Sequence, residues 1–365
     1  TELIRGLFNN TPADKEKLKE INMDLLFETA VRHKVSALVS KALESQSGEE
    51  RWKKALDMAV YRMMMFDGER QQLVNYLEKE GIWYLPLKGI ILAGYYPQYG
   101  LREMSDNDIL FDASFSNEVK NWFVERNYEV KSFGAGAHDV YLKKPVLNFE
   151  MHRSLFTYSR GTSNAYYLNV RERLLKDIDN GYGYHFSNDD FFVYLLVHAL
   201  KHFEGAGTGI RTLADIYLYL KKESVDLNYV AEELEKMELA EKGMMLVSVS
   251  KKVFNGEPLD SSENEMVNYI FSSGVYGTME NRVTNQLKKE TETGKSSASA
   301  KWKYVFNRIF IHGEDLKNSY PFFWRYKILV PVCWAYRCIR AAGKWKSINR
   351  ELKYVRNYGK EDGNE

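Results

Sequence analysis

Hydrophobic residues in the first eighty positions recur every three or four residues, as on amphipathic helices. Between residues 25 and 42 this spacing is carried by Leu25, Leu26, Ala30, Val31, Val35, Leu38, Val39 and Ala42. Residues 51–80 continue with the same period. The pattern predicts helices over residues 11–80.

The pattern changes between residues 81 and 152 to short apolar runs bounded by glycines and polar residues. Runs of this kind are typical of strands, and we expect strands at 81–89, 107–111, 128–133, 139–142 and 146–152. Helical spacing returns at 90–96 and 114–127. The order of these elements predicts a mixed sheet with helices packed on it.

Beyond residue 189 the spacing is helical again. We expect helices at 191–203, 210–220, 228–237, 241–254, 323–340 and 344–355, and an exposed loop over the polar, low-complexity residues 288–300. The predicted organisation is therefore a helical segment (1–80), an α/β core (81–160), a helical domain (161–357) and a disordered tail (358–365).

Composition narrows the class of protein. Of 365 residues, 44% are hydrophobic and 28% are charged, which excludes collagen-like, disulfide-scaffold and disordered classes. Cys333 and Cys338, five apart in one predicted helix, suit neither a disulfide nor a structural zinc site, so we expect a reducing, cytoplasmic compartment. Residues 1–10 show no signal-peptide pattern, and charges interrupt the most apolar stretch, 321–339, so neither secretion nor a membrane span is predicted.

Charge is unevenly distributed along the chain. Residues 301–357 hold 13 Lys and Arg against 3 Asp and Glu, a net of +10, whereas the remainder carries −9. We expect this basic segment to dock against the acidic remainder of the same chain. Nucleic acid or an anionic membrane surface stays open as an alternative partner.

The candidate chemistry lies in the predicted sheet. Alternation along a strand puts Asp106 and Asp108 on one side, where two carboxylates repel unless a cation lies between them. Glu150 lies on another predicted strand, and three converging carboxylates can hold two metal ions about 3.5–4 Å apart. His152, two residues further on, shares the face of Glu150.

This pattern resembles the polymerase-β-type nucleotidyltransferase superfamily and, more narrowly, a bacterial family of uncharacterised nucleotidyltransferase-like proteins. The features that carry the resemblance occur in order: Lys88-Gly89, Tyr96-Pro97, Arg102 with Asp106 and Asp108, Glu150 with His152, His198 with His202, and Arg211 with Asp215. The resemblance implies an α+β fold, with a nucleotidyltransferase-like mixed β-sheet core, flanking helices and a C-terminal helical domain.

The resemblance also implies roles. Asp106, Asp108 and Glu150 would be the catalytic carboxylates and would bind two Mg²⁺ or Mn²⁺ ions. Nucleotide binding would fall to Lys88, Gly89, Arg102 and Ser105, and the substrate would be lined by His152, His198, His202, Arg211 and Asp215. An acceptor hydroxyl, on a molecule that the sequence does not specify, would attack the α-phosphate of an NTP, and pyrophosphate would leave.

Several residues depart from the superfamily pattern or have simpler explanations. Lys88-Gly89 stands where Gly-Ser is usual, Asn107 separates the aspartates, and Glu150 replaces Asp, so a catalytically inactive binding or scaffold protein is the alternative. Arg102 has Asp106 or Glu103 as a possible ion-pair partner, and Arg211 has Asp215 on the same helix face. His198 and His202, four apart, are either structural or, with Asp215, a zinc site.

Overall fold

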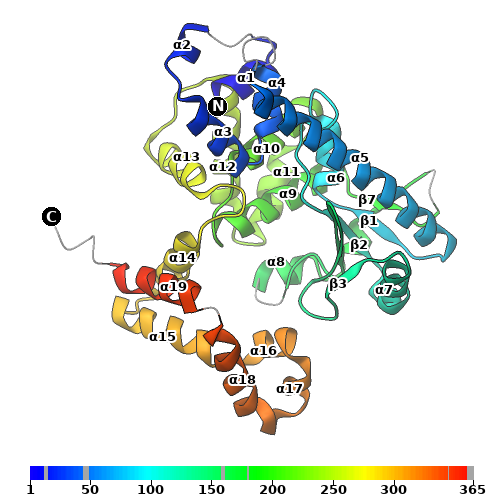
Figure 1. Cartoon of the computed structure of the whole chain (residues 1–365), viewed down its shortest axis with the longest axis vertical. Helices are drawn as coiled ribbons and strands as arrows, with labels where there is room; N and C mark the ends of the chain where they lie inside the picture. Colours follow the sequence, from blue (N-terminus) through cyan, green and yellow to red (C-terminus); the bar gives the residue numbers. More distant parts are fainter. Residues whose placement is uncertain (12–14, 44–48, 158–160, 179–180, 344, 360–365) are drawn as a thin grey trace. The chain divides into compact units, whose positions relative to one another are not determined.

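The computed structural model describes residues 1–11, 15–43, 49–157, 161–178, 181–343 and 345–359. The structure is mixed α+β, as predicted, with a five-stranded mixed sheet, flanking helices and a helical C-terminal region (Figure 1). Its contacts divide the chain into two compact units: a sheet unit (Thr1–Leu200 and Gly209–Val275) and a helical unit (Lys201–Thr208 and Tyr276–Glu365). The domain limits drawn from the sequence stay a prediction, and most of the predicted tail, 360–365, lies outside the described residues.

The helices predicted over residues 11–80 are confirmed in the described residues, and one further helix precedes them. Together these helices are α1 (Glu2–Phe8), α2 (Lys15–Lys19), α3 (Met23–Arg32), α4 (Ser36–Leu43) and α5 (Glu50–Lys79). The 30-residue α5 buries only five of its residues. Tertiary packing of that narrow face, and not the isolated helix, therefore supplies most of its stability.

The five predicted strands are also confirmed; the strand at 107–111 has the predicted ends, the strand at 139–142 is one residue longer at each end, and the other three are shorter than predicted. They are β1 (Tyr84–Pro86), β2 (Asn107–Phe111), β3 (Glu129–Ser132), β4 (His138–Lys143) and β5 (Leu147–His152). Their order in the sheet is β1-β2-β5-β4-β3, with β2 and β5 parallel and the other neighbours antiparallel. The short helices between them are α6 (Gly89–Leu92), η1 (Ala93–Tyr95), η2 (Ala113–Phe115) and α7 (Ser116–Glu125).

One face of this sheet packs against α5 and α7 (Figure 1). Alternate residues of the central strands, Ile109 and Phe111 on β2 and Phe149 and Met151 on β5, enter this core. Because side chains alternate across a strand, the residues between them face the opposite side. That side carries Asp108, Glu150 and His152.

The sheet unit continues with a small hairpin and further helices. These elements are α8 (Gly161–Tyr166), η4 (Val170–Arg173), β6 (Leu175–Lys176), β7 (Tyr184–His185), α9 (Asn188–Phe203), α10 (Ile210–Lys222), α11 (Leu227–Glu235), α12 (Ala240–Asn255) and α13 (Ser261–Ser273). Nine residues of α9 are buried, on all sides of the helix, which marks it as an interior helix.

The helical unit corrects two expectations. Its elements are α14 (Met279–Glu292), α15 (Ser297–Ile309), α16 (Gly313–Ser319), α17 (Pro321–Arg325), η5 (Lys327–Leu329), α18 (Val330–Ala342) and α19 (Trp345–Asn357). The loop predicted over 288–300 is wrong, because the Ser296 side chain caps α15 by accepting the backbone N–H of Ser299. The single helix predicted over 323–340 is broken, and Pro331, which lacks an N–H, lies in the first turn of α18.

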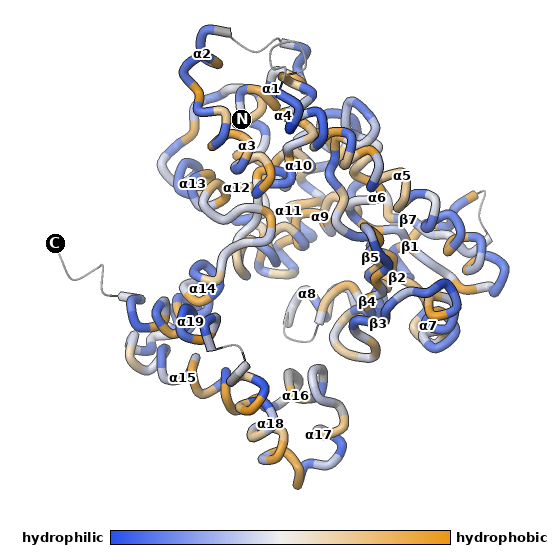
Figure 2. Tube along the Cα trace, viewed as in Figure 1, coloured by the Kyte–Doolittle hydropathy of each residue, from blue (hydrophilic) through white to orange (hydrophobic). Residues whose placement is uncertain are grey.

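Some basic residues of this unit pair with acidic residues of the same unit. Arg308 donates to the buried Glu351, and Lys303 lies 2.6 Å from Glu290. Apolar residues of α18 and of the turn before it are exposed, among them Ile328 and Ile339, and the tube in Figure 2 is largely apolar there.

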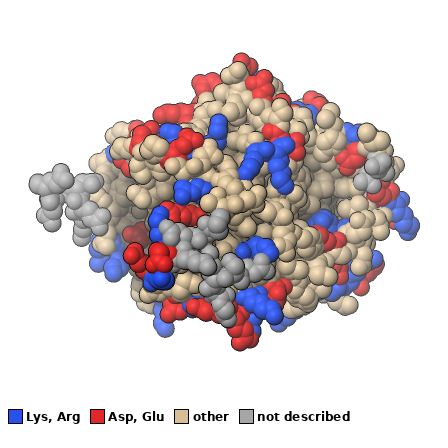
Figure 3. All heavy atoms as spheres, turned by 90° about the horizontal axis from the view of Figure 1, so that it is seen from above, with Lys and Arg blue, Asp and Glu red and all other residues tan. Residues whose placement is uncertain are grey.

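Two observations bear on the surface of the described chain. On the face drawn in Figure 3, basic and acidic side chains lie intermixed. Of the helices that the structure describes, none combines the length and apolar character that crossing a bilayer requires.

A buried histidine of the sheet unit makes the fold sensitive to acid. His33 ends α3, where its Nδ1 accepts the backbone N–H of Ile210 (3.2 Å) and its Nε2 donates to the carbonyl oxygen of Phe271 (3.1 Å). Burial, with the charge of Arg32, lowers the pKa of His33 from 6.5 to about 4. The neutral ring is therefore part of the folded state.

We expect protonation of His33 to lower the free energy of unfolding by about 2 kcal/mol between pH 7 and pH 5. In this range the unfolded chain binds a proton at His33, whereas the ring stays neutral in the folded chain. Urea unfolding of the wild type and of His33→Gln at both pH values measures the difference. The variant, which cannot titrate, should show a smaller loss. Equal losses in the two proteins would refute the assignment.

Candidate active site

The polar side chains of the sheet meet because of strand register. Parallel pairing sets Asp108 of β2 beside Glu150 of β5, and antiparallel pairing sets His138 of β4 opposite His152 of β5. Paired residues on adjacent strands share a face of the sheet. Asp106 lies in the loop one residue before β2 begins.

Asp108 is the centre of this group. Its side chain is 6% exposed, its Oδ2 lies 3.2 Å from the Nζ of Lys88, and its Oδ1 lies 2.8 Å from the Nε2 of His152. Burial by itself would raise the pKa of Asp108, but the charge of Lys88 and the hydrogen bond from His152 outweigh it and hold that pKa well below its usual range. Asp108 is therefore ionised and paired through both oxygens.

Lys88 reaches Asp108 from a strained position in the chain. It lies between β1 and α6 with a φ of +38°, a conformation that costs a residue with a side chain free energy. Gly89 begins α6 at a close approach, since an added Cβ would lie 2.7 Å from the Nη1 of Arg102 and 2.9 Å from the Cε of Met104. Strain of this kind concentrates at functional sites.

Asp106 adds negative charge to the group. Burial, and then the charge of Asp108, raise the pKa of Asp106 to about 6, although Lys88, Arg211 and Arg102 act in the opposite direction. Burial is the largest cause of this shift, so a cation bound beside Asp106 would favour its ionised form.

A second cluster adjoins Asp108. The Nε2 of His138 lies 3.4 Å from the Oε2 of Glu150, and the Nε2 of His152 lies 4.0 Å from the same oxygen. Among the described residues, these three form the one group of His, Cys, Asp and Glu side chains with the spacing of metal ligands. Sequence reasoning missed His138, which a correct register for the hairpin of β4 and β5 would have placed beside His152.

Arg102 and Asp215 form a buried ion pair. The Nε and Nη2 of Arg102 each donate to one oxygen of Asp215 at 2.8 Å, and the hydroxyl of Tyr96 donates to Asp215 at 2.7 Å. From the sequence, Asp106 or Glu103 was the predicted ion-pair partner of Arg102, and Arg211 was the predicted ion-pair partner of Asp215. The ion pair in the structure instead joins residues 113 positions apart.

The loop before Asp106 is anchored from two further elements. Arg211 of α10 donates to the carbonyl oxygen of Glu103 (2.6 Å), and the carboxylate of Glu103 accepts the hydroxyl of Ser36 at the start of α4 (2.7 Å). Ser105, predicted to bind nucleotide, lies half-buried in this loop. Arg102, Arg211 and Asp215 therefore hold the position of Asp106.

The unusual Asn107 is fully accommodated on the α5 side of β2. Its Nδ2 donates to the carbonyl oxygen of Phe66 (3.3 Å), and its Oδ1 accepts from Arg70 (3.1 Å). The departure at position 107 therefore leaves the buried amide hydrogen-bonded, which avoids the cost of an unpaired polar group.

The histidines on α9 lie in different surroundings. His198 is half-buried, with its ring 6.1 Å from the ring of Tyr194, whereas His202 is exposed. Neither belongs to a metal-spaced group within the described part of the chain, and Asp215 is paired with Arg102. Tyr194, which sequence reasoning also missed, is buried near enough to Lys88 and Asp108 for their charges to act on its hydroxyl.

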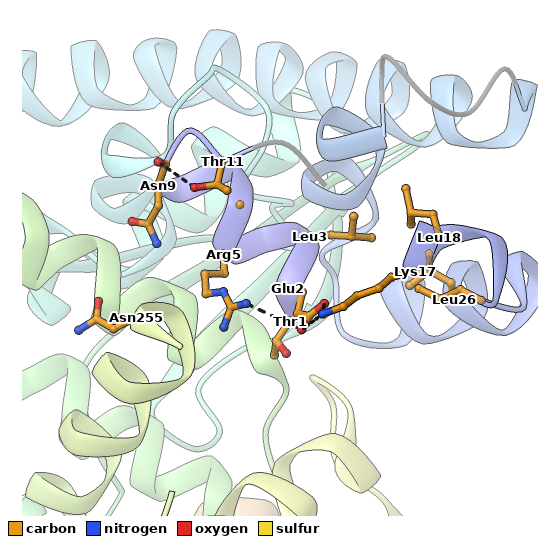
Figure 4. Close-up of a pocket in the computed structure, with 12 residues that line it drawn as sticks. Thr1, Glu2, Leu3, Arg5, Asn9, Thr11, Lys17, Leu18, Leu26 and Asn255 are labelled. Atoms are coloured by element: carbon orange, nitrogen blue, oxygen red, sulfur yellow. Dashed lines mark hydrogen bonds and ion pairs between the residues drawn. The ribbon is translucent and has the colours of Figure 1, made fainter. Parts of the chain in front are cut away.

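A cavity of about 490 Å³ lies elsewhere in the sheet unit (Figure 4). It is lined by residues of α1, α2, α3 and α12 and their flanking loops. In its wall, the Oε1 of Glu2 lies 3.3 Å from the Nζ of Lys17 and 3.8 Å from the Nη2 of Arg5. None of the predicted site residues lines it.

Residues 19–255 match the model of a family described as "Uncharacterised nucleotidyltransferase". The match covers more than half of the chain and includes every residue of the site described above. The chain therefore belongs to this nucleotidyltransferase family. Neither the comparison with curated proteins nor the comparison with solved structures found a match.

Removal of one partner from the buried ion pair of Arg102 with Asp215 should strongly destabilise the fold. We expect Asp215→Asn to lower the free energy of unfolding by about 3–5 kcal/mol, because it leaves the guanidinium buried without a counter-charge. Urea unfolding at pH 7 measures this loss. The double variant Arg102→Met/Asp215→Leu should lose less than the single variants together.

The matched control is Glu50→Gln, which removes the exposed ion pair with Lys54 on α5. This change should cost less than about 0.5 kcal/mol. A cost for Asp215→Asn no larger than that of the control would contradict the supporting role of the buried pair.

Proposed function

We propose that the chain is a metal-dependent nucleotidyltransferase of the polymerase-β type, which transfers NMP from an NTP to a hydroxyl of a small-molecule, sugar or protein acceptor. Membership of the family supports the general reaction. The observation that carries the proposal is the parallel register of Asp108 with Glu150, beside Asp106 and Lys88.

The three carboxylates supply donor atoms of the type that a divalent cation binds, although of the three only Glu150 belongs to the metal-spaced group of the described residues. Asp106, Asp108 and Glu150 offer carboxylate oxygens, the ligands that Mg²⁺ and Mn²⁺ prefer. Lys88 compensates the charge of Asp108, and a bound cation would favour the ionised form of the buried Asp106. Two bound ions would supply charge neutralisation at the triphosphate.

The remaining roles follow from exposure and charge. The side chain of Glu150 is 24% exposed against 6% for Asp108, so Glu150 is the carboxylate that an acceptor hydroxyl can reach and to which it can give its proton. Lys88 is a point charge for the phosphates, and the four-residue α6 adds the backbone of Gly89. We assign Arg102, Arg211 and Asp215 to positioning, and Ser105, His152 and His198 to lining the site. His202 is exposed and belongs to the helical unit, so it has no role in this proposal.

Calorimetric titration with ATP, GTP, CTP and UTP tests the donor site. We expect one nucleotide to bind only with Mg²⁺ or Mn²⁺, and to bind at least about tenfold more weakly to Asp106→Asn/Asp108→Asn, because the variant has lost two oxygen-donor charges. Asp57→Asn, an exposed aspartate on α5, is the control and should bind like the wild type. Binding that ignores the metal, or that survives in the double variant, would reject the site.

The second candidate is a catalytically inactive binding or scaffold protein on the same fold. It is favoured by the internal pairing of Asp108, whose two oxygens are already engaged by Lys88 and His152. In that case the group would be a structural charge cluster.

Thermal melting separates the two candidates. A nucleotidyltransferase should gain stability from metal and its NTP, by RT ln(1 + [L]/Kd), which is about 2.7 kcal/mol at a ligand concentration 100 times Kd. This gain should vanish in Asp108→Asn. A scaffold protein would show no shift with any nucleotide, while Asp108→Asn would still lower its melting temperature because Lys88 loses its partner.

A further inference from the structure

We infer that His138, Glu150 and His152 form a mixed nitrogen and oxygen site for a divalent transition-metal ion of the Zn²⁺ class. The site deepens the proposed function, on which its catalytic meaning rests, because Glu150 belongs to both ligand sets. Its metal affinity is a property of the protein without nucleotide.

The three ligands are brought together by the β4–β5 ladder. His138 is the direct cross-strand partner of His152, and Glu150 lies two residues before His152 on the same face of β5. One ligand atom from each side chain lies within 4.8 Å of the other two. The strands are central in the sheet, so the backbone positions of the ligands are fixed before any ion binds.

The distances are close to those of a bound ion. Ligand atoms at 2.0–2.2 Å from a tetrahedral Zn²⁺ are roughly 3.4 Å apart. The Nε2 of His138 already lies 3.4 Å from the Oε2 of Glu150, and the Nε2 of His152 lies 4.0 Å from that oxygen. Small side-chain rotations bring all three to one ion.

The chemistry of the donors selects the ion. Imidazole nitrogens suit Zn²⁺ and its neighbours in the transition series, whereas Mg²⁺ demands oxygen ligands in near-octahedral geometry. Two histidines and one carboxylate leave a fourth position open, as in catalytic zinc sites. The Nε2 of His152 now donates to the Oδ1 of Asp108 (2.8 Å), so an ion bound at Nε2 takes the place of that proton and replaces this hydrogen bond.

Solvent reaches the cluster from one side. The side chains of His138 and Glu150 are 33% and 24% exposed, whereas that of His152 is 4% exposed. An ion from solvent therefore reaches His138 and Glu150 first and binds the buried His152 last. Of the three ligands, only Glu150 belongs to the three-carboxylate site, and His152 also pairs with Asp108, so substitution of His138 isolates the mixed site.

The consequence is that the two ion positions of the proposed enzyme differ in kind. Asp106 and Asp108 offer oxygen ligands for a hard ion, and His138 with His152 offers nitrogen ligands for a transition metal. Glu150 serves both positions. A preparation loaded with Mg²⁺ alone would then fill the oxygen position and leave the mixed position to a transition metal.

Calorimetric titration of the full chain, freed of metal with a chelator, with ZnCl₂ and separately with MgCl₂ and without nucleotide, tests the inference. We expect one Zn²⁺ per chain at the cluster, bound at least about 100-fold more tightly than Mg²⁺. His138→Gln should weaken Zn²⁺ by more than the roughly 10–100-fold cost of losing an outer-shell partner. His312→Gln, at an exposed histidine of the helical unit, should bind Zn²⁺ like the wild type.

Co²⁺ in place of Zn²⁺ gives a spectroscopic readout that a merely structural role would not move. Its visible absorption should report nitrogen ligation in the wild type and change in His138→Gln. His138→Asp should restore binding but shift the preference toward Mn²⁺ and Mg²⁺, since an oxygen replaces a nitrogen. This gain distinguishes a lost ligand from a lost fold.

Equal Zn²⁺ affinity in the wild type and His138→Gln would overturn the inference, and so would equal affinities for Zn²⁺ and Mg²⁺. These outcomes are separable from a failure of the proposed function. Loss of the Zn²⁺ site with intact Mg²⁺-dependent nucleotide binding removes only the mixed site. Zn²⁺ binding without any nucleotide binding retains the mixed site and removes the transferase.

Discussion

The parallel pairing of β2 with β5 is the constraint on which the candidate site depends. Every other neighbouring pair among the described strands of this sheet is antiparallel. Because β5 returns beside β2, Asp108 and Glu150 reach the same register from positions 42 residues apart. The face opposite α5 and α7 thereby becomes polar, while Ile109 and Phe149 keep the other face apolar.

The charges on that face are held in place at a cost. Asp108 is buried and ionised because Lys88 and His152 engage it, and Lys88 adopts a strained backbone to do so. The loop that carries Asp106 is tied to α10 through Arg102 and Asp215. Buried ion pairs of this kind contribute little net stability but fix geometry, and fixed geometry is what charge-based catalysis of phosphoryl-type transfer requires.

The contacts of Asp108 with Lys88 and His152 bear on whether the protein is an active enzyme. A scaffold protein would keep the pairing of Asp108 with Lys88, whereas an enzyme must release part of it when a metal and a triphosphate arrive. Lys88 is suited to such an exchange, since its flexible stem can turn from a carboxylate to a phosphate while keeping its charge near the site. Membership of the nucleotidyltransferase family favours the enzyme.

Local hydrophobic patterns were enough to predict the strands and the long α5, because alternation and helical spacing depend only on residues near one another in the chain. The same patterns put Asp106, Asp108 and Glu150 in or next to predicted strands. The loop predicted at 288–300 failed because the cap at Ser296 and the burial of Ala300 outweigh a polar composition. His138 joined Glu150 and His152 only through the antiparallel register of β4 with β5, and Arg102 met Asp215 only when α10 packed beside its loop. These contacts form between residues far apart in the chain, and local sequence patterns do not report them. The sequence therefore identified the candidate carboxylates, whereas the tertiary structure decided which residues pair with them.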